Sequence, residues 1–372
     1  MLRGPRLEIS ASRLRHNFRL LKDLVGKRAV ICVIKADAYG HGMVECAREF
    51  AAEGANMFGV AYNEEAIGLR QAGVEGQVIV FFDEIDIEKI IKYKLTPIIY
   101  NVKSACEASK WALKYNVSLN VHINVDTGMG RVGFLYDLGV ENIKKVLQLD
   151  NINVVGFMSH FSEADLIDRA FAYNQLERFM EVKKELSDYL KQSTVLWHMS
   201  NSAASLTLKE AYLDAIRPGI ALYGYSPLNY KNGAYNNIDL RPVMTVKTNL
   251  IEVRNVPAGR SISYCRTFIT KRDSVIGVLP MGYADGYQRI LSNNAFVLVR
   301  GQRASIVGRI CMDTIMVDLT DISGVDYNDE VVLIGKQMDN SISANELAVR
   351  ANTISYEVLT TFGRINKKTL VE

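Results

Sequence analysis

Short apolar runs alternate with amphipathic stretches along the N-terminal part of the chain. Eight of the runs resemble strands in length and in β-branched content, and they span residues 29–35, 57–61, 77–82, 95–100, 119–126, 152–160, 195–200 and 213–224. Helical patterns lie between them, for example at 42–54, 63–73 and 104–116, and Ser10 or Ser12 is placed to cap a first helix at 10–26. Apolar strands that each precede a helix indicate parallel strands buried on both faces.

Eight such units in about 220 residues match the size of a closed (β/α)8 barrel, which we take as the fold of this region. An open, doubly wound sheet is the competing arrangement. No G-x-G-x-x-G follows the first strand, which counts against the dinucleotide site that many open sheets carry.

The pattern changes at "LNYKNGAYNNIDLRP" (228–242), an Asn-rich stretch that indicates a domain boundary. Beyond it, β-branched runs dominate and helical pattern is scarce until 343–352. The predicted fold class is therefore α/β, with an N-terminal (β/α)8 TIM-like barrel at 1–235 and a C-terminal mostly-β domain at 236–372. The first residues of the chain are candidates for pairing with the second domain.

Composition and charge add exclusions to this picture. Hydrophobic residues make up 48% and charged residues 23%, and the net charge of +3 includes no basic block that would suggest nucleic acid. The start of the chain has no apolar signal region, and no stretch has the length of a membrane span, so we expect a cytoplasmic protein. The cysteines are scattered without a CxxC pair, which favours reduced thiols and no metal site; they are Cys32, Cys46, Cys106, Cys265 and Cys311.

Polar residues follow the predicted strands, at the end where barrels carry their chemistry. Lys35 ends the first strand, and Arg131 lies in the Gly-rich segment "DTGMGRVG" after the fifth. The later strand ends supply Ser159, His160, His198, Asn201, Ser202, Arg217, Gly219 and Ile220.

Two of these strand ends suggest a phosphate. Asn201 and Ser202 open a predicted helix, whose free N–H groups and dipole favour an anion, and Gly219 follows the next strand. Barrels often bind phosphate between these two loops. A phosphate there and a lysine across the mouth indicate pyridoxal phosphate, a carbonyl cofactor held as a Schiff base. Each residue alone is more often a cap or a solvated side chain, and only their convergence favours the cofactor.

Eight segments, in order, give this chain a clear resemblance to alanine racemase. They are "VIKADAYGHG", "DTGMGRVGF", "HMSNSAA", "RPGIALYGYSP", "SISYCRTF", "MGYADGY", "GRICMDTIMVD" and "TISYEVLT", and they extend over both predicted domains. The resemblance implies a pyridoxal phosphate enzyme that interconverts L-alanine and D-alanine, a peptidoglycan precursor, and that forms a head-to-tail homodimer with shared active sites.

The resemblance also implies two catalytic bases. Lys35 carries the cofactor as an internal aldimine and serves one face of the substrate, and Tyr264, from the partner subunit, serves the other. Free tyrosine has a pKa near 10, so a phenolate at pH 7 costs roughly 4 kcal/mol. A hydrogen-bonded run from Tyr264 to His160 to Arg217 is implied as the device that lowers this cost. Arg217 faces the pyridine nitrogen and, as a permanent cation, cannot hold a proton on it.

The remaining matches are implied by the same segments. The phosphate contacts are Tyr39, Ser202, Gly219, Ile220 and Tyr356, with Asn201 beside them and His198 supporting Arg217. The substrate-binding residues are Arg131, Met312 of the partner subunit, and Tyr283 at a narrow entrance.

Asn124 departs from the pattern, because some members of the family have there a lysine that can be carbamylated. Asparagine cannot be modified in this way. We therefore predict that chloride, another small anion or a water network lies beside Asn124 and Arg131.

Alternatives remain open beside this assignment. A racemase for serine or other small amino acids is the nearest. A pyridoxal phosphate decarboxylase of similar architecture should lack "SISYCR" and the Arg217 partner. A single-domain cofactor carrier would lack the β-rich domain, and a binding domain is expected to have lost one of the two bases.

Overall fold

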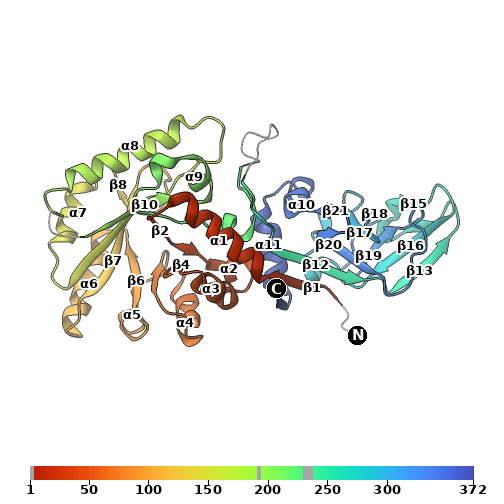
Figure 1. The fold of residues 1–372 in the computed structure, drawn as a ribbon, viewed down its shortest axis with the longest axis horizontal. Coiled ribbons are helices and arrows are strands. Elements are labelled where there is room, and N and C mark those ends of the chain that lie inside the picture. The colour runs from red at the N-terminus through yellow and green to blue at the C-terminus, as the bar shows by residue number, and fades with distance from the viewer. Residues whose placement is uncertain (1–3, 191–193, 229–237) are drawn as a thin grey trace. The chain divides into compact units, whose positions relative to one another are not determined.

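The computed structural model describes residues 4–190, 194–228 and 238–372 (Figure 1). The chain divides into two compact units. The barrel unit consists of Leu14–Ala38 and Met43–Leu240, and the β unit consists of Met1–Arg13, Tyr39–Gly42 and Arg241–Glu372. The predicted boundary at 235/236 lies outside the described residues.

The barrel unit is built on one parallel sheet whose strand order is β2-β11-β10-β9-β7-β6-β5-β4-β3. β2 and β3 are consecutive halves of one strand, and the N–H of Ile31 between them donates to the carbonyl of Ile216 at 2.8 Å. The sheet therefore closes on itself, which confirms the predicted barrel. The strands are β2 (Ala29–Val30), β3 (Cys32–Val33), β4 (Met57–Val60), β5 (Gln77–Val80), β6 (Leu95–Ile99), β7 (Leu119–Asp126), β9 (Ile152–Met158), β10 (Leu196–Ser200) and β11 (Ala215–Ile216).

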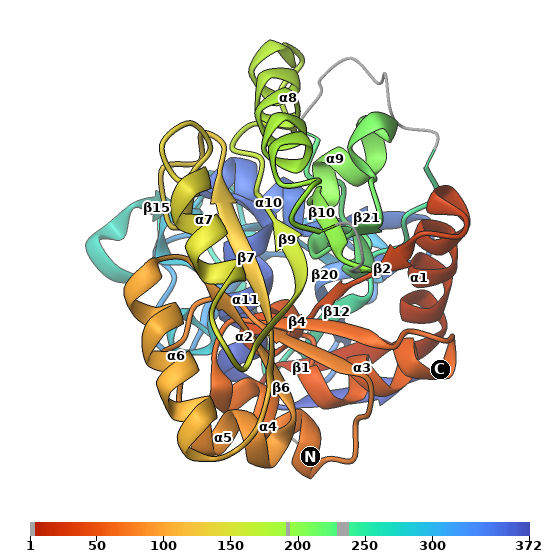
Figure 2. The ribbon, with the colours of Figure 1, turned by 90° about the vertical axis from the view of Figure 1, so that its left-hand side faces the viewer.

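Helices cover the outside of this sheet, as Figure 2 shows around the barrel unit. They are α1 (Ala11–Val25), α3 (Met43–Ala52), α4 (Asn63–Gln71), α5 (Ile87–Tyr93), α6 (Val102–Lys114), α7 (Val140–Leu147), α8 (Ala170–Glu185) and α9 (Ser202–Thr207). Ser10 rather than Ser12 caps α1, because its hydroxyl accepts from the N–H of Arg13 at 3.4 Å.

Two predicted strands are shorter than their apolar runs. The first ends at Val33, and Lys35 begins a helical turn, α2 (Lys35–Gly40). The eighth contains only β11, because Pro218 has no N–H to extend the ladder, and the apolar residues after it form the 3-10 turn η2 (Ile220–Tyr223). Ile220–Tyr223 are thus buried in a 3-10 turn after the strand and not within the strand itself.

The β unit is built on a second sheet with the strand order β13-β16-β19-β18-β17-β20-β12-β1-β22, with β21 added on β20. Its strands are β1 (Arg6–Ser10), β12 (Met244–Asn249), β13 (Glu252–Val256), β16 (Ser274–Leu279), β17 (Phe296–Val299), β18 (Gln302–Ile306), β19 (Ile315–Asp318), β20 (Glu330–Gln337), β21 (Asn340–Ile342) and β22 (Lys368–Val371). β1 pairs antiparallel with β12 and parallel with β22, so both ends of the chain contribute to this sheet.

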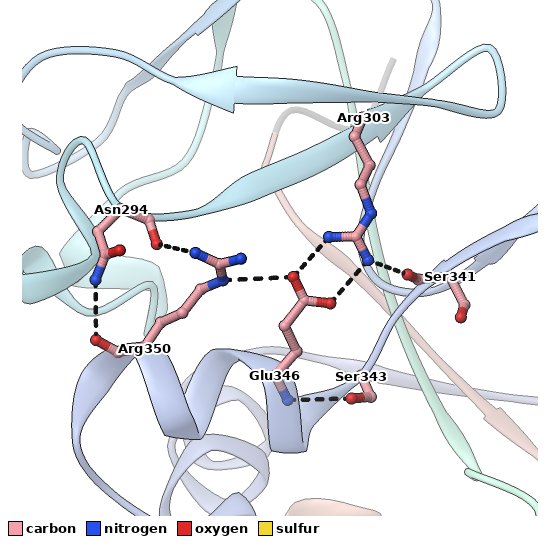
Figure 3. A network of polar contacts seen from close by, with 6 residues as sticks. All are labelled: Asn294, Arg303, Ser341, Ser343, Glu346 and Arg350. Atoms are coloured by element: carbon pink, nitrogen blue, oxygen red, sulfur yellow. Dashed lines mark hydrogen bonds and ion pairs between the residues drawn. The ribbon is translucent and has the colours of Figure 1, made fainter.

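Helices α10 (Ala344–Ala351) and α11 (Ser355–Ile365) belong to the same unit. An ion-pair network joins α10 to β18 (Figure 3). Arg303 binds both oxygens of Glu346, at 2.6 and 2.8 Å, and Arg350 donates to Glu346 at 3.4 Å and to the carbonyl of Asn294 at 3.2 Å. Among the described residues, no helix is long and apolar enough to cross a membrane.

Candidate active site

Lys35 is the first residue of α2, a turn with unusual backbone geometry. The four non-glycine residues after it, Ala36 to Tyr39, all have φ between 52° and 55°, so the turn is left-handed. Left-handed helical geometry costs roughly 1–2 kcal/mol per residue, so other contacts must hold it. Glu65 of α4 supplies one, because its carboxylate accepts from the N–H of Ala36 at 2.6 Å and from that of Ala61 at 2.7 Å.

The amine of Lys35 lies in a partly buried, electropositive environment. Burial lowers its pKa, the cation of Arg131 lowers the pKa further, and the carboxylate of Glu65 opposes both effects. Both cations lie over the ring of Phe82, with Lys35 Nζ 5.4 Å and the Arg131 guanidinium 4.8 Å from its centroid. A lowered amine pKa makes Lys35 available as a neutral base or nucleophile nearer to neutral pH.

Arg217 follows β11 and is buried in the barrel unit. Its Nη1 donates to His198 Nδ1 at 2.6 Å and to the His198 carbonyl at 2.8 Å. Its Nη2 donates to the carbonyl of Ser159 at 2.5 Å and lies 3.3 Å from His160 Nδ1. Burial, and then Arg131, lower the pKa of Arg217 to about 9, so the guanidinium stays charged at neutral pH.

The two histidines that contact Arg217 are neutral. Burial and then the Arg217 cation lower the pKa of both His160 and His198 well below the ordinary histidine value. Because Arg217 can only donate, His160 Nδ1 must accept from it, and a neutral His160 ring therefore carries its proton on Nε2. The predicted contacts of Arg217 with His160 and His198 are thus present in the structure.

Ser202, the first residue of α9, joins the loops after the seventh and eighth strands. Its hydroxyl accepts from the N–H of Gly219 at 2.8 Å and from that of Ala221 at 3.3 Å, which leaves its own O–H as a donor. The side chain of Asn201 accepts from the N–H of Ala204 at 3.0 Å and so acts as the helix cap. These contacts bring Ser202 next to the segment that contains Gly219 and Ile220.

Asp126, the last residue of β7, shapes the loop that carries Arg131. One of its carboxylate oxygens accepts from three successive N–H groups, those of Gly128, Met129 and Gly130, at 2.9 to 3.2 Å. Asn124 donates from its amide nitrogen to the carbonyl of Val132. The asparagine therefore contacts the backbone beside Arg131.

In the β unit, Tyr39 and Tyr356 lie against each other, with ring centroids 5.8 Å apart. Gly40 is required beside them, since its φ is +85° and a Cβ there would lie 2.5 Å from the carbonyl oxygen of Leu359. The two tyrosines that the sequence assigns to one phosphate are therefore neighbours, although 316 positions separate them.

Three other predicted residues occupy adjoining loops of the β unit. Tyr264 follows Ser263, whose hydroxyl donates to the carbonyl of Arg309 at 2.5 Å. The N–H of Tyr283 donates to the carbonyl of Cys311 at 3.1 Å, next to Met312. Tyr264, Tyr283 and Met312 are 66%, 41% and 53% exposed, so adjoining loops present three large and mostly apolar side chains to solvent.

The backbone around Tyr264 is strained. Ser263, Cys265 and Arg266 have φ values of 62°, 59° and 49°, although none of them is glycine. Such strain concentrates at functional sites, where it aims a side chain.

Pyridoxal phosphate fits the groups of the barrel unit by their charge and chemistry. Three cations influence one another there, Lys35, Arg131 and Arg217, while the oxygens of Glu65 and Asp126 accept from backbone N–H groups. Asp126 acts on Arg131 through its charge and raises the pKa that burial lowers, but within the described part of the chain no carboxylate hydrogen-bonds to Arg131 or Arg217. An anionic ligand with an aldehyde suits this excess of positive charge and a partly neutral lysine.

Sequence reasoning missed several groups that hold these residues. Glu65, Phe82 and His122 contact the site from within a helix, a loop and a strand, where an acid, an aromatic or a histidine is unremarkable. Only Asp126 carried a usable signal, because an Asp before a Gly-rich segment is typical of a side-chain-stabilised turn.

The comparisons with known proteins agree with this geometry. The family described as "Alanine racemase, N-terminal domain" matches residues 9–227, and "Alanine racemase, C-terminal domain" matches residues 243–370. The alanine racemase of Thermodesulfovibrio yellowstonii is 47% identical over 377 residues, which cover 100% of this chain and 99% of the relative. That of Halothermothrix orenii is 44% identical, with 95% and 93% covered.

Solved structures give the same result. The alanine racemase from D-cycloserine-producing Streptomyces lavendulae has a TM-score of 0.93 at 30% identity, covering 100% of this chain and 98% of that one. That of Bartonella henselae, with covalently bound pyridoxal phosphate, has a TM-score of 0.87 at 27% identity and covers 100% of both chains. The chain therefore belongs to the alanine racemase family of amino-acid isomerases.

Proposed function

We propose that this chain interconverts L-alanine and D-alanine with pyridoxal phosphate as its cofactor. The observation that carries the proposal is the excess of cations around Lys35, Arg131 and Arg217, beside the free donor of Ser202. When bound, the cofactor supplies an aldehyde and an electron-withdrawing ring that acidifies the α-proton of the amino acid.

Lys35 is the proposed attachment residue and the base for one face of the substrate. Its lowered pKa supports this role, because a base is most effective when its pKa lies near the working pH. The left-handed turn held by Glu65 gives the amine a defined direction.

Tyr264 of the partner subunit is the proposed base for the opposite face. Arg217 holds His160 with its proton on Nε2, so His160 is prepared to donate to a phenolate oxygen and lower the cost of forming it. The exposure of Tyr264 within a single chain supports a role across a subunit interface.

Ser202 is proposed to contact the phosphate through its hydroxyl, next to the loop of Gly219 and Ile220. Asn201 caps the helix that begins at Ser202. The neighbouring tyrosines Tyr39 and Tyr356 are the other proposed phosphate contacts. Arg217, held by His198, is proposed to face the ring nitrogen.

For the substrate, we propose that Arg131 binds the carboxylate together with Met312 of the partner subunit, and that Tyr283 narrows the entrance. The adjoining loops that carry Tyr283 and Met312 support a head-to-tail homodimer with shared sites. In this role the chain would supply D-alanine for peptidoglycan in the cytoplasm.

We also propose a small anion, such as chloride, beside Asn124 and Arg131. Asn124 is neutral and its amide contacts the loop backbone, so the charge of Arg131 lacks a direct carboxylate partner among the described residues. Crystals grown with bromide in place of chloride should show an anomalous peak within about 4 Å of Arg131, a normal contact for a charge-assisted pair. A map with Arg131 paired to a protein carboxylate and no peak would contradict this.

The first experiment is proton NMR of L-alanine in deuterated water with the holoenzyme, beside a chiral assay and a parallel L-serine sample. Loss of the α-proton signal with D-alanine appearing is the expected result. Exchange with retained L configuration would mean that only the Lys35 face works, and faster turnover of serine would reassign the substrate. Absence of exchange with bound cofactor would overturn the proposal.

A further inference from the structure

A line of buried polar side chains runs from Arg217 to the far end of the barrel. Arg217 Nη1 donates to His198 Nδ1 at 2.6 Å, and His198 Nε2 lies 2.8 Å from His122 Nδ1. His122 Nε2 then lies 3.4 Å from the side-chain Nε2 of Gln77. His122 and His198 are both 0% exposed.

The packing inside the barrel leaves space for these side chains. His122 is on β7 and His198 is on β10, and β9 lies between them in the sheet. His122 pairs in register with Gly156 of β9, and a Cβ on Gly156 would lie 2.4 Å from ring atoms of His122. Glycine at 156 is therefore what allows the two rings to meet across the strand.

The far end of the line is accessible to water. Gln77, Thr96 and Asn120, all near the N-terminal ends of their strands, line an open hollow of about 810 Å³. The last member of the line can thus exchange hydrogen bonds with solvent, whereas the histidines cannot.

In the wild-type line, the direction of each hydrogen bond can be traced from Arg217, which only donates. A guanidinium only donates, so His198 Nδ1 must accept and its single proton must be on Nε2. That proton points at His122 Nδ1, which must therefore also accept, so His122 carries its own proton on Nε2. The nitrogen of the Gln77 amide faces His122 Nε2 and Thr96 Oγ1 in the structure, and two donors cannot bond each other. The direction traced from Arg217 therefore assigns the amide the reverse orientation, with its oxygen accepting from His122 and from the Thr96 hydroxyl.

We propose that His122 is a positioning residue for the reaction: by accepting from His198, it keeps His198 Nδ1 unprotonated and thereby holds Arg217 in place. This deepens the proposed function, because it rests on Arg217 as the residue that faces the cofactor ring. Arg217 and His122 are the charged or titratable groups that face His198, and burial and Arg217 lower the pKa of His122 to about 3. Both rings thus stay neutral over the working range of pH.

Two substitutions separate this role from simple filling of the core. His122→Asn retains an acceptor near the position of Nδ1, whereas His122→Leu fills similar space without one. Phe157→Leu is the matched control, since Phe157 is fully buried on β9 and stacks on Trp197 away from the hydrogen-bonded line. It should lower stability without changing any histidine tautomer.

The direct measurement is long-range ¹H–¹⁵N NMR of the deuterated holoenzyme with ¹⁵N-labelled histidine. The chain has five histidines, so the spectrum can be assigned. Wild-type His122 and His198 should both show the neutral Nε2–H pattern from about pH 6 to 9, where an ordinary histidine titrates. In His122→Leu, His198 should move toward the Nδ1–H form, and in His122→Asn and Phe157→Leu it should not.

Kinetics supply a second measurement. His122→Leu should lower kcat/KM about tenfold and His122→Asn less than threefold, as for residues that orient another group. An Nδ1–H pattern for His198 in the wild type, or an unchanged pattern in His122→Leu, would overturn the proposal. If the tautomers behaved as expected but the α-proton of alanine did not exchange, the proposed reaction would be wrong, while His122 would still be the residue that positions His198 and Arg217.

Discussion

Arg217 shows how much one buried side chain determines in this site. Its donors bind carbonyl oxygens and two histidine rings, and no carboxylate pairs with it in the part of the chain that the structure describes. A cation that faces the ring nitrogen cannot protonate it as a carboxylic acid partner would. We therefore infer that Arg217 limits the electron-withdrawing power of the cofactor and with it the side reactions.

Arg217→Glu tests this at the residue scale. Racemisation should fall about a hundredfold, as when a preorganised charge is lost, while the fraction of turnovers that end in transamination rises. Pyruvate formation and the absorbance of pyridoxamine phosphate measure that fraction. Arg217→Lys, which keeps the charge, is the control, and an equal product ratio in wild type and Arg217→Glu would contradict the inference.

The sequence predicts which residues lie at the strand ends, because the end of an apolar run is a local feature. Lys35, His198 and Arg217 follow apolar runs that the sequence displays directly. Glu65 and His122 could not be predicted, because their roles depend on which helix or strand lies opposite, and nothing in their own neighbourhood marks this.

At the scale of elements, the network between α10 and β18 holds part of the β unit together. Glu346 accepts from Arg303 in a bidentate pair and from Arg350, and its own N–H donates to Ser343 at 3.1 Å. The hydrogen bond from Arg303 is the main cause that lowers the pKa of Glu346 below its usual value.

Glu346→Gln should therefore lower the free energy of unfolding by about 1 kcal/mol at pH 7, a modest value because both partners are partly exposed. A carboxylate with a depressed folded-state pKa stabilises above its unfolded pKa, near 4.5, and the effect is lost as pH falls through the folded value. The difference between mutant and wild type should hence vanish in acid.

Urea unfolding followed by circular dichroism from neutral to acid pH measures this difference. Glu252→Gln on β13 removes the same charge from an exposed position and should have little effect at any pH. A difference between Glu346→Gln and wild type that persists unchanged in acid would show that Glu346 stabilises through packing rather than charge.

Several elements differ from their sequence patterns for reasons of chain geometry. The left-handed turn at α2 and the short β11 both interrupt apolar runs that look like continuous strands. Periodicity identifies buried residues well, yet it does not distinguish a strand from an apolar turn at a barrel mouth.

At the scale of the whole molecule, the proposed site needs two chains. Lys35 belongs to the barrel unit and Tyr264 to the β unit, and in the proposal each site takes one from each subunit. The exposed set of Tyr264, Tyr283 and Met312 is then covered in the dimer.

Mixing two inactive variants tests this arrangement. Lys35→Ala and Tyr264→Phe, unfolded together and refolded at equal amounts, should recover about a quarter of wild-type activity, because about half of the dimers are mixed and each has one intact site. Chiral assay of D-alanine measures the recovery. The double variant Lys35→Ala/Tyr264→Phe, mixed with itself, should recover none, and failure of the first mixture to regain activity would place both bases in one chain.

The two-part architecture, the barrel and the residues at its strand ends could be predicted before the structure was known. These follow from local periodicity, since strands that are buried on both faces must be apolar along their length and end in polar residues. The contacts that hold those residues in place depend on the folded chain. Glu65 fastens the turn after Lys35 and Gly156 lets His122 reach His198, because barrel closure brings distant strands and helices within hydrogen-bonding distance.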